Sequence, residues 1–307
     1  MVFPHRGTCR RGRGAEGERF CRGAVTRIDP LSGIGRVLRC LVLLASHTAS
    51  ASSGQPERVV SLSLCTDQLV LVLADRRQIA SLSSLSRDPD LSDLAAAAAS
   101  VPQNRGTVEE VLLQEPDLIL AGPWGSYQAG KLLERLGHRV MWVRPAEDFD
   151  MIRAQVRQVG DALGQSQRAA AVLENMEQTL VALQTFPAAS PNTAAIAYLA
   201  GGYTYGAGTL FDAVLQASGL ENGAVGLGIN GFAPLPLESV VMLRPDYLIF
   251  QYYRRDAHTL GKSVLEHPAL LGSRLGARRL TAALPRLACG TPQTAQVARE
   301  LADGRAR

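Results

Sequence analysis

The sequence is poor in histidine and cysteine, two side chains that often bind metals or act in catalysis. Five histidines and five cysteines occur among the 307 residues, and they form no cluster with the spacing of a metal site. The phosphate-binding pattern GxxxxGK(S/T) and the hydrolase pattern GxSxG are also absent. The segment GLGING at 226–231 matches the letters of a dinucleotide-binding fingerprint. It neither follows a predicted strand nor opens a predicted helix, so we interpret it as a loop.

Excess positive charge is confined to the first 51 residues. The chain has a net charge of +4, but residues 1–51 hold nine arginines against three acidic residues and so carry +6. The remaining 256 residues therefore carry −2. This leaves no broad basic surface for nucleic acid or an anionic membrane, so we expect neither as a partner.

The end of this basic segment has the pattern of an export signal. Arg36 and Arg39 stand at the start of an apolar run, 38–45, and residues 49–51 read Ala-Ser-Ala, a cleavage site of small residues. The run is too short to span a bilayer. We therefore predict a cleaved signal peptide, a cut after Ala51 and a periplasmic location. The alternative is a disordered basic tail.

One sequence pattern occurs twice, at 107–120 (TVEEVLLQEPDLIL) and at 236–250 (PLESVVMLRPDYLIF). In each copy a Glu opens an apolar helical turn, a Pro-Asp pair follows, and a continuous apolar strand comes next. Proline ends the helix because the residue before it avoids the helical region. A strand without polar alternation is buried on both faces, as in a parallel α/β sheet. The duplication predicts two α/β lobes with a ligand-binding cleft between them.

The order of these patterns predicts four segments along the chain. They are a leader at 1–51, an N-terminal lobe at 52–164, an interlobe helix at 165–185 and a C-terminal lobe at 186–307. Among the smaller elements we expect a helix at 91–100, a loop rich in glycine and tyrosine at 200–206, and a closing strand at 284–288.

Two cysteines, Cys65 and Cys289, remain once the leader is removed. An even number of cysteines in an oxidising compartment permits a disulfide. However, 224 positions separate the two, and they belong to different predicted lobes. The sequence leaves open whether they form a disulfide or remain as thiols, and whether either lies in the cleft.

Aromatic residues are also few, 16 in all, yet several follow predicted strands. The ends of strands are where open α/β sheets bind ligands, and flat aromatic faces suit a large planar or chelated ligand. We therefore predict a set of ligand-binding residues near the strand ends: Asn104, Arg105, Trp124 and Tyr127 in the first lobe, and Tyr203, Tyr205, Phe232, Tyr252, Tyr253 and Arg254 in the second.

Together these segments resemble the periplasmic substrate-binding proteins of ABC importers for iron-siderophores, haem and cobalamin. The resemblance spans nearly the whole chain after the leader and is carried by residues 58–75, 107–120, 136–143, 236–250 and 289–302. The segment LGHRVMWV at 136–143 is especially similar to the cobalamin-binding member. The resemblance implies an α/β fold of two Rossmann-like lobes with central parallel sheets, joined by one long interlobe helix that permits little hinge motion.

The resemblance also implies a function and its partners. We expect a monomer without enzymatic activity or a cofactor, which captures a small-molecule metal chelate and delivers it to an ABC permease and its ATPase in the inner membrane. Glu109 and Glu238 are then expected at the outer tips of the lobes, docked against arginines of the permease. The disulfide of the cobalamin-binding member lies within the second lobe, so it does not transfer to Cys65 and Cys289.

The residues leave the cargo open. Arg105 and Arg254 suit an anionic siderophore or the propionates of haem, whereas Trp124 and the tyrosines suit the face of a corrin or porphyrin. An alternative function is a two-lobed α/β enzyme or metallocluster protein that uses the same cleft, which needs a thiolate cluster or a cofactor loop. A binding protein for free metal ions needs several histidine and carboxylate ligands, and histidine is scarce here.

Overall fold

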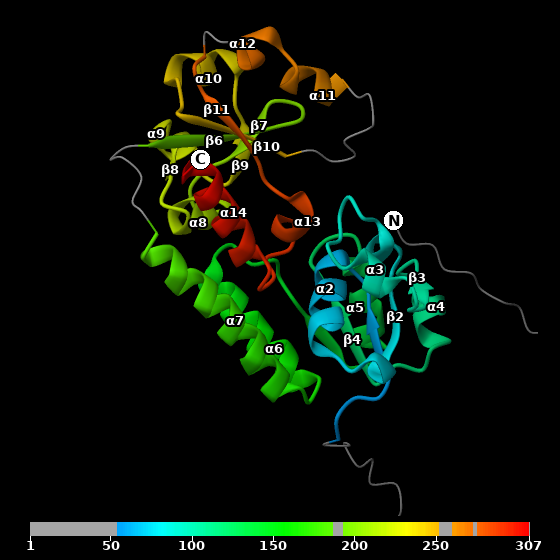
Figure 1. The fold of residues 1–307 in the computed structure, drawn as a ribbon. Helices are drawn as coiled ribbons and strands as arrows, with labels where there is room; N and C mark the ends of the chain where they lie inside the picture. Colours follow the sequence, from blue (N-terminus) through cyan, green and yellow to red (C-terminus); the bar gives the residue numbers. More distant parts are fainter. Residues whose placement is uncertain (1–53, 187–192, 252–259, 273–274, 307) are drawn as a thin grey trace, which may run out of the picture. The chain divides into compact units, whose positions relative to one another are not determined.

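Five parallel strands form the first sheet. The computed structural model describes residues 54–186, 193–251, 260–272 and 275–306 (Figure 1). In sequence, the strands are β1 (Val59–Ser61), β2 (Ile79–Ser83), β3 (Gln103–Asn104), β4 (Leu118–Ala121) and β5 (Val140–Trp142). In the sheet their order is β3-β2-β1-β4-β5. Every residue of the central strands β1 and β4 is buried, as expected where helices cover both faces of a parallel sheet.

The second sheet combines parallel and antiparallel pairing. Its strands are β6 (Ala194–Leu199), β7 (Tyr203–Tyr205), β8 (Glu221–Asn222), β9 (Phe232–Pro234), β10 (Tyr247–Gln251) and β11 (Arg278–Thr281). Strand β6 pairs in parallel with β8 and β10, and β10 pairs in parallel with β11. By contrast, β7 pairs antiparallel with both β6 and β9. The predicted α/β fold with central parallel sheets is confirmed, and the second sheet has an antiparallel edge in addition.

The loop predicted at 200–206 is wrong over the three residues of β7. Strand β6 turns directly into β7 because Gly201 and Gly202 have φ values of +84° and +77°, which other residues rarely adopt. The backbone N–H of Gly202 closes the turn by donating to Leu199 O at 3.0 Å. Tyr203 pairs with Pro234 of β9, and a partner so distant in sequence leaves no local signal.

The two copies of the duplicated pattern adopt the same local structure. Helices α4 (Val108–Leu112) and α10 (Leu237–Leu243) are each followed by a turn with a left-handed backbone. The left-handed residues are Glu115, with a φ of +46°, and Arg244, with a φ of +47°. Each directly precedes the proline of its copy, where a right-handed helical backbone is disfavoured. The proline therefore ends the helix in both lobes, as the sequence predicts.

The aspartate of each copy attaches its strand to the neighbouring strand. Asp117 accepts hydrogen bonds from the backbone N–H groups of Glu57 at 2.6 Å and Arg58 at 3.0 Å, just before β1. Asp246 accepts one from the N–H of Ala194, the first residue of β6, at 2.8 Å. Glu57 and Arg58 precede β1, and Ala194 precedes the residues of β6 that pair with β10. The carboxylates therefore supply acceptors for N–H groups at the start of each strand. The Pro-Asp pair thus ends a helix and aligns two strands.

Two long helices connect the sheets in sequence, α6 (Phe149–Ala162) and α7 (Ser166–Gln184). Asp148 caps α6 by accepting a hydrogen bond from the N–H of Met151 at 2.7 Å. Gly164, with a φ of +69°, separates the two helices. The 19 residues of α7 correspond to about 28 Å of helix, which agrees with the predicted long interlobe helix.

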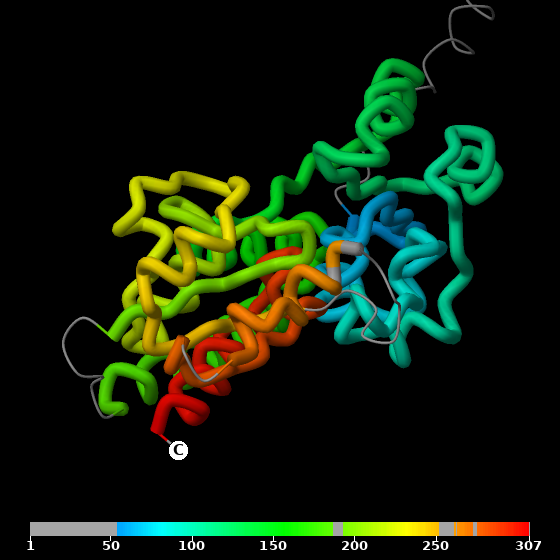
Figure 2. The backbone as a smooth tube through the Cα atoms, turned by 90° about the horizontal axis from the view of Figure 1, so that it is seen from above, coloured from blue at the N-terminus to red at the C-terminus, as the bar shows by residue number. Residues whose placement is uncertain are grey.

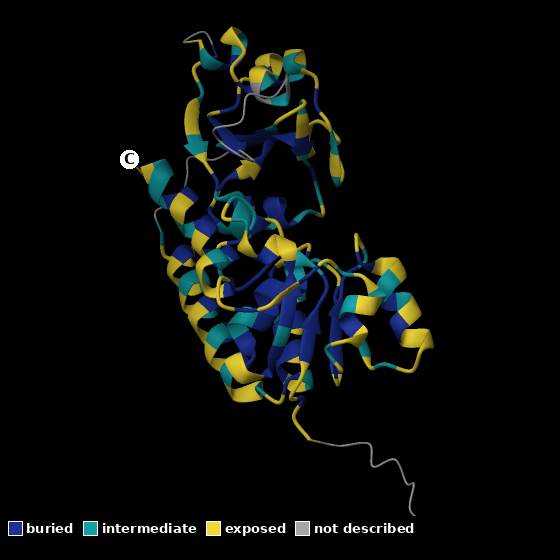
Figure 3. Cartoon of the chain, turned by 90° about the vertical axis from the view of Figure 1, so that its right-hand side faces the viewer, coloured by how far each residue is buried: buried dark blue, intermediate teal, exposed yellow. Residues whose placement is uncertain are grey.

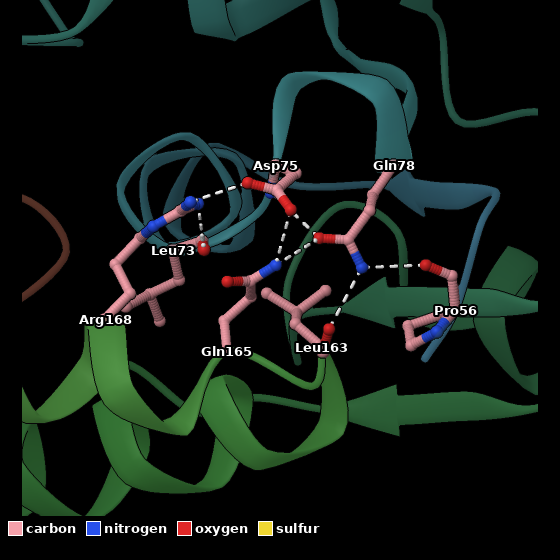
Figure 4. A network of polar contacts seen from close by, with 7 residues as sticks. All are labelled: Pro56, Leu73, Asp75, Gln78, Leu163, Gln165 and Arg168. Carbon is pink, nitrogen blue, oxygen red and sulfur yellow. Dashed lines mark hydrogen bonds and ion pairs between the residues drawn. The ribbon is translucent and has the colours of Figure 1, made fainter. Parts of the chain in front are cut away.

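Polar contacts attach the start of α7 to the first lobe (Figure 4). Arg168 forms an ion pair with Asp75 at 2.6 Å, and the guanidinium lowers the pKa of that carboxyl, helped by the amide of Gln165. Gln165 Nε2 donates to Asp75 Oδ2 at 2.9 Å and to Gln78 Oε1 at 3.1 Å. Gln78 Nε2 in turn donates to Leu163 O at 2.9 Å. The bend between α6 and α7 is therefore held to residues 75–78 of the first lobe by hydrogen bonds and an ion pair.

The hydrophobic core is continuous along these helices. Helix α14 (Thr294–Ala306) packs against α7 and against α8 (Leu210–Ala217), as Figures 1 and 2 show. One cluster of buried apolar side chains extends from β1 and α2 (Leu64–Leu73) through α6 and α7 to α8 and α14. Figure 3 shows the central strands buried and the outer faces of the helices exposed. This pattern is that of amphipathic helices laid on buried sheets.

The helix predicted at 91–100 is wrong for most of its length. Only α3 (Ala95–Ala98) is helical there. Upstream, the N–H groups of Leu91 and Ser92 both donate to Asp88 O, and Ser92 Oγ accepts from the N–H of Leu94. A serine side chain that binds a nearby backbone group competes with helix formation, so the alanine run forms a helix only beyond this turn.

The closing strand predicted at 284–288 is also wrong. Residues Leu284–Leu287 form a short helix, α13, and the edge strand is β11, a few residues earlier. Pro285 occupies the first turn of α13, where its missing N–H costs no hydrogen bond. In a strand the same proline removes a donor from the ladder. The apolar composition of 284–288 suggested a buried strand, but Pro285 favours the start of a helix at this position.

The remaining helical segments are short. They are η1 (Arg76–Gln78), η2 (Ser84–Arg87), α5 (Tyr127–Arg135), α9 (Gly223–Gly226), α11 (Leu260–Leu265) and α12 (Pro268–Leu271). The GLGING segment runs from the end of α9 to β9, with positive φ at Gly228 and Gly231, which agrees with its interpretation as a loop. Within the described ranges, no helix is both long and apolar enough to cross a membrane.

Candidate functional site

A cavity of about 410 Å³ lies at the carboxyl ends of the strands of the first sheet. All five strands contribute the residues that end or follow them, namely 62–65, 83–85, 104–106, 122–126, 143 and 145. Because the strands are parallel, their carboxyl ends meet at one edge, where open α/β sheets bind ligands. The sequence predicted a site at this edge.

Glycine allows the loop after β4 to lie close to the loop after β1. A Cβ atom added to Gly122 would lie 2.9 Å from Ser63 Oγ and 3.4 Å from Ser63 Cβ. A larger residue at this position therefore requires the Ser63 side chain to move. The close approach brings the hydroxyl of Ser63 and the loop 122–126 into the same cavity wall.

Asn104 lies in the cavity wall, but its side chain also binds the protein. It is 1% exposed. Its Nδ2 donates to Ser61 O at 3.0 Å and to Ser81 Oγ at 2.8 Å, and its Oδ1 accepts from the N–H of Gly106 at 3.0 Å. Its amide therefore joins the ends of β1, β2 and β3, and we assign it a positioning role in the wall.

Asp67 is a buried acid beneath this wall that the sequence reading missed. It is 0% exposed, and it accepts hydrogen bonds from the N–H of Ser83 at 3.0 Å and from the Ser83 hydroxyl. Burial raises the pKa of Asp67 to about 7, although hydrogen bonds from Ser61 and Ser83 favour the ionised form. These hydrogen bonds fix Ser83, the last residue of β2, which lines the cavity. Its sequence context, at the start of an apolar helix, is equally typical of a helix cap.

Trp124 and Arg105, two of the predicted ligand-binding residues, line the same cavity. The side chain of Trp124 is 71% exposed, so its indole face is available to a ligand. Arg105 is exposed, and its backbone N–H is held by Glu110 Oε2 at 2.7 Å. Tyr127 lies outside the cavity lining within the described residues, and its ring packs against Trp142 with centroids 5.3 Å apart. Tyr127 therefore remains a prediction without support from this geometry.

The second lobe carries an aromatic surface on its antiparallel edge. The rings of Tyr203 on β7 and Phe232 on β9 are stacked, with centroids 4.9 Å apart and planes 4° from parallel. They are 39% and 58% exposed. Tyr205 packs against Phe232 and Phe211, and burial raises the pKa of its hydroxyl. The pairing of β7 with β9 thus brings three predicted residues, Tyr203, Tyr205 and Phe232, together.

Three predicted ligand-binding residues lie outside the described residues. These are Tyr252, Tyr253 and Arg254, which follow the carboxyl end of β10 in sequence.

Cys65 and Cys289 form a disulfide, and Cys65 also lines the cavity. The bond attaches the first lobe to the segment between β11 and α14, which we call the strap, residues 282–293. Gln68 Nε2 in α2 donates to Pro285 O in the strap at 3.3 Å, and Arg286 of the strap pairs with Asp93 at 3.2 Å. The strap is therefore a second connection between the lobes, besides α6 and α7.

Glu109 and Glu238 occupy equivalent positions in the two lobes. Each lies in the first turn of its helix, α4 or α10, and each is exposed. Thr107 caps α4 by accepting a hydrogen bond from the N–H of Glu110 at 3.3 Å. A carboxylate in the first turn is favoured by the helix dipole, so both residues present a charged oxygen to solvent.

Similar sequences occur among curated cobalamin-binding proteins. The chain is 26% identical over 242 residues to a cobalamin-binding protein of Halobacterium salinarum, a match that covers 76% of the chain. It spans about 60% of the length of that relative.

Within the described ranges, no group of three or more histidine, cysteine, aspartate or glutamate residues could hold a metal ion.

Solved structures show the same fold. A possible iron-binding (periplasmic solute-binding) protein of Staphylococcus epidermidis has a TM-score of 0.67 at 17% identity, covering 83% of this chain and 100% of that one. A periplasmic haem-binding protein of Pseudomonas aeruginosa has a TM-score of 0.63 at 23% identity, covering 82% of this chain and 93% of that one.

A protein-family model shows to which family the chain belongs. The model for periplasmic binding proteins matches residues 59–274, a range that includes both copies of the duplicated pattern and the cavity. Proteins of this family bind ligands. The chain belongs to the periplasmic binding protein family.

Proposed function

We propose that this protein is the substrate-binding component of an ABC importer. It captures a metal chelate, which is an iron-siderophore, haem or cobalamin, and delivers it to a permease and its ATPase. The observation that carries this proposal is the cavity at the carboxyl edge of the first sheet, with the exposed indole of Trp124 in its lining. A concave, mostly apolar wall with a small number of polar groups is the usual setting for a small ligand.

The aromatic surface of Tyr203, Tyr205 and Phe232 is proposed as the contact of the second lobe with the same ligand. Stacked and exposed rings offer a flat apolar face, which a corrin, a porphyrin or the backbone of a siderophore can cover. The cobalamin-binding and haem-binding relatives support this class of ligand. The proposed site of action is the periplasm, reached through cleavage after Ala51, a segment outside the described residues.

Replacement of Trp124 by alanine tests the ligand site. Burial of about 100 Å² of indole surface contributes about 2.5 kcal/mol, so we expect the Kd for the bound chelate to rise about 10- to 100-fold. The measurement is isothermal titration calorimetry with haemin, cyanocobalamin and ferric siderophores on residues 52–307. Met242→Ala is the matched control, because Met242 is 76% exposed on α10. Equal affinity in Trp124→Ala and wild type would remove Trp124 from the site.

Glu109 and Glu238 are proposed to dock on basic residues of the permease. Two charge contacts at equivalent positions of the duplicated pattern orient the protein over its partner and speed encounter. The equivalent positions of the two residues in α4 and α10, and their exposure, support this role.

Charge reversal at these glutamates tests the docking. In proteoliposomes that contain the cognate permease and ATPase, the double variant Glu109→Lys/Glu238→Lys is expected to lose at least about 10-fold in ligand-stimulated ATP hydrolysis, because each contact becomes repulsive. Its affinity for the chelate stays unchanged. Glu174→Lys, an exposed charge reversal on α7, serves as the control. Normal stimulation by the double variant would rule out these two residues as docking points.

A further inference from the structure

Ser126 has a buried hydroxyl that forms no hydrogen bond within the protein. The residue is 4% exposed, and its Oγ has no partner. It also lines the cavity at the end of the first sheet. A buried polar atom without a partner is uncommon in native proteins and calls for an explanation such as a ligand.

The position of Ser126 makes this lack of a partner more informative. Ser126 is the N-cap residue of α5, and a serine there normally accepts a hydrogen bond from the first turn. Thr107, Asp148 and Thr209 do so at the starts of α4, α6 and α8, each with an extended backbone. Ser126 instead has φ −95° and ψ 4°, and its side chain makes no capping bond. Its hydroxyl is thus not used by the helix that it begins.

The cavity wall around Ser126 includes a helix N-terminus and a cationic side chain. A helix N-terminus presents N–H groups and a partial positive charge, and α5 begins at the wall with nine residues behind it. Arg105 lines the same cavity, and no aspartate or glutamate of the described chain does so. A hydroxyl, a helix N-terminus and a guanidinium together favour an oxygen that accepts hydrogen bonds or carries negative charge.

We propose that Ser126 Oγ and the start of α5 form a subsite for an acceptor oxygen at the periphery of the bound chelate. The oxygen belongs to a carboxylate, as in the side chains of porphyrins and citrate-type siderophores, or to an amide carbonyl, as around a corrin. Ser126 is then a specificity-determining residue for the cargo. This inference rests on the proposed ligand-binding function and adds to it the polar group by which the cavity recognises its ligand.

Ser126→Ala tests the subsite in the chain of residues 52–307, titrated with haemin, cyanocobalamin and ferric citrate. Loss of a hydrogen bond to the ligand is expected to raise the Kd of the bound chelate about 5- to 20-fold. The Tm of the ligand-free protein is expected to stay the same or rise slightly, because the hydroxyl makes no bond to lose. Ser100→Ala is the matched control, since Ser100 is exposed and lies outside the cavity lining, and its Kd and Tm stay at wild-type values.

Arg105→Gln distinguishes the two sources of the oxygen. A carboxylate loses affinity in Arg105→Gln as well as in Ser126→Ala, whereas an amide carbonyl loses it in Ser126→Ala alone. Wild-type binding with an unchanged Kd in Ser126→Ala would overturn the subsite and leave the proposed function intact. A lower Tm in the ligand-free variant would also overturn it, because the hydroxyl would then be structural. Failure of the wild type to bind any of these chelates would overturn the proposed function and the subsite together.

Discussion

Replacement of both Cys65 and Cys289 by alanine is expected to lower the free energy of unfolding by about 3–5 kcal/mol. The disulfide joins residues 224 positions apart, so in the unfolded chain it closes a very long loop and removes much of its conformational entropy. The variant lacks this constraint, and the loss corresponds to a fall in Tm of about 10 °C for a chain of this size.

Urea unfolding followed by far-UV circular dichroism measures this effect. Wild type treated with dithiothreitol should unfold at the same urea concentration as the double variant, and the variant itself should not respond to dithiothreitol. Of the contacts between strap and first lobe, those of Gln68 with Pro285 and of Arg286 with Asp93 remain in the variant. Equal stability of the variant and the oxidised wild type would mean that these contacts hold the strap without the disulfide.

Asp67→Asn is expected to change how stability depends on pH. Burial raises the pKa of Asp67 in the folded protein to about 7 from an ordinary value of 3.8. The folded state therefore binds a proton that the unfolded state has released over this range. The favourable contribution of the neutral acid is fully present below pH 3.8 and is lost as the pH rises to about 7. Asparagine, which cannot ionise, keeps its contribution at every pH.

The variant should therefore gain stability relative to wild type as the pH rises. A shift of about three pKa units corresponds to about 4 kcal/mol, so the difference in unfolding free energy between Asp67→Asn and wild type should grow by up to that amount between pH 4 and pH 8. Urea titrations at several pH values measure it. Glu174→Gln, an exposed substitution on α7, provides the control. A difference between Asp67→Asn and wild type that is constant with pH would show that Asp67 is ionised throughout.

The duplicated pattern was predictable because its structure is determined locally. Pro116 and Pro245 restrict the residues before them whatever the surroundings, and the apolar runs that follow admit few alternatives to a buried strand. The strands at the first sheet's carboxyl edge could be placed in the same way, and with them Trp124 and Arg105. The long helix α7 followed from an uninterrupted polar and apolar pattern between Gly164 and Phe186.

The elements that the sequence did not reveal depend on distant partners. Strand β7 exists because it pairs with β9, 31 positions away at Tyr203 and Pro234, and the disulfide needs two lobes to bring its cysteines together. The buried acid Asp67 and the hydroxyl of Ser126 each look like an ordinary helix cap in the sequence. Their burial and hydrogen bonding arise from the packing of several loops at the sheet edge. Local patterns therefore placed Asn104, Arg105 and Trp124 at this edge, but they did not single out Asp67 or the hydroxyl of Ser126.

The most direct test of the proposed function is a fluorescence titration of the Trp142→Phe variant of residues 52–307. Because the chain has two tryptophans, this variant retains Trp124 alone, and Trp124 lies in the cavity lining. Addition of cyanocobalamin, haemin or ferric siderophores, corrected for their absorbance, is predicted to give saturable quenching by one chelate class at a ratio of one ligand per chain. Absence of quenching by every chelate would contradict the chelate-binding function and direct the search to other small ligands.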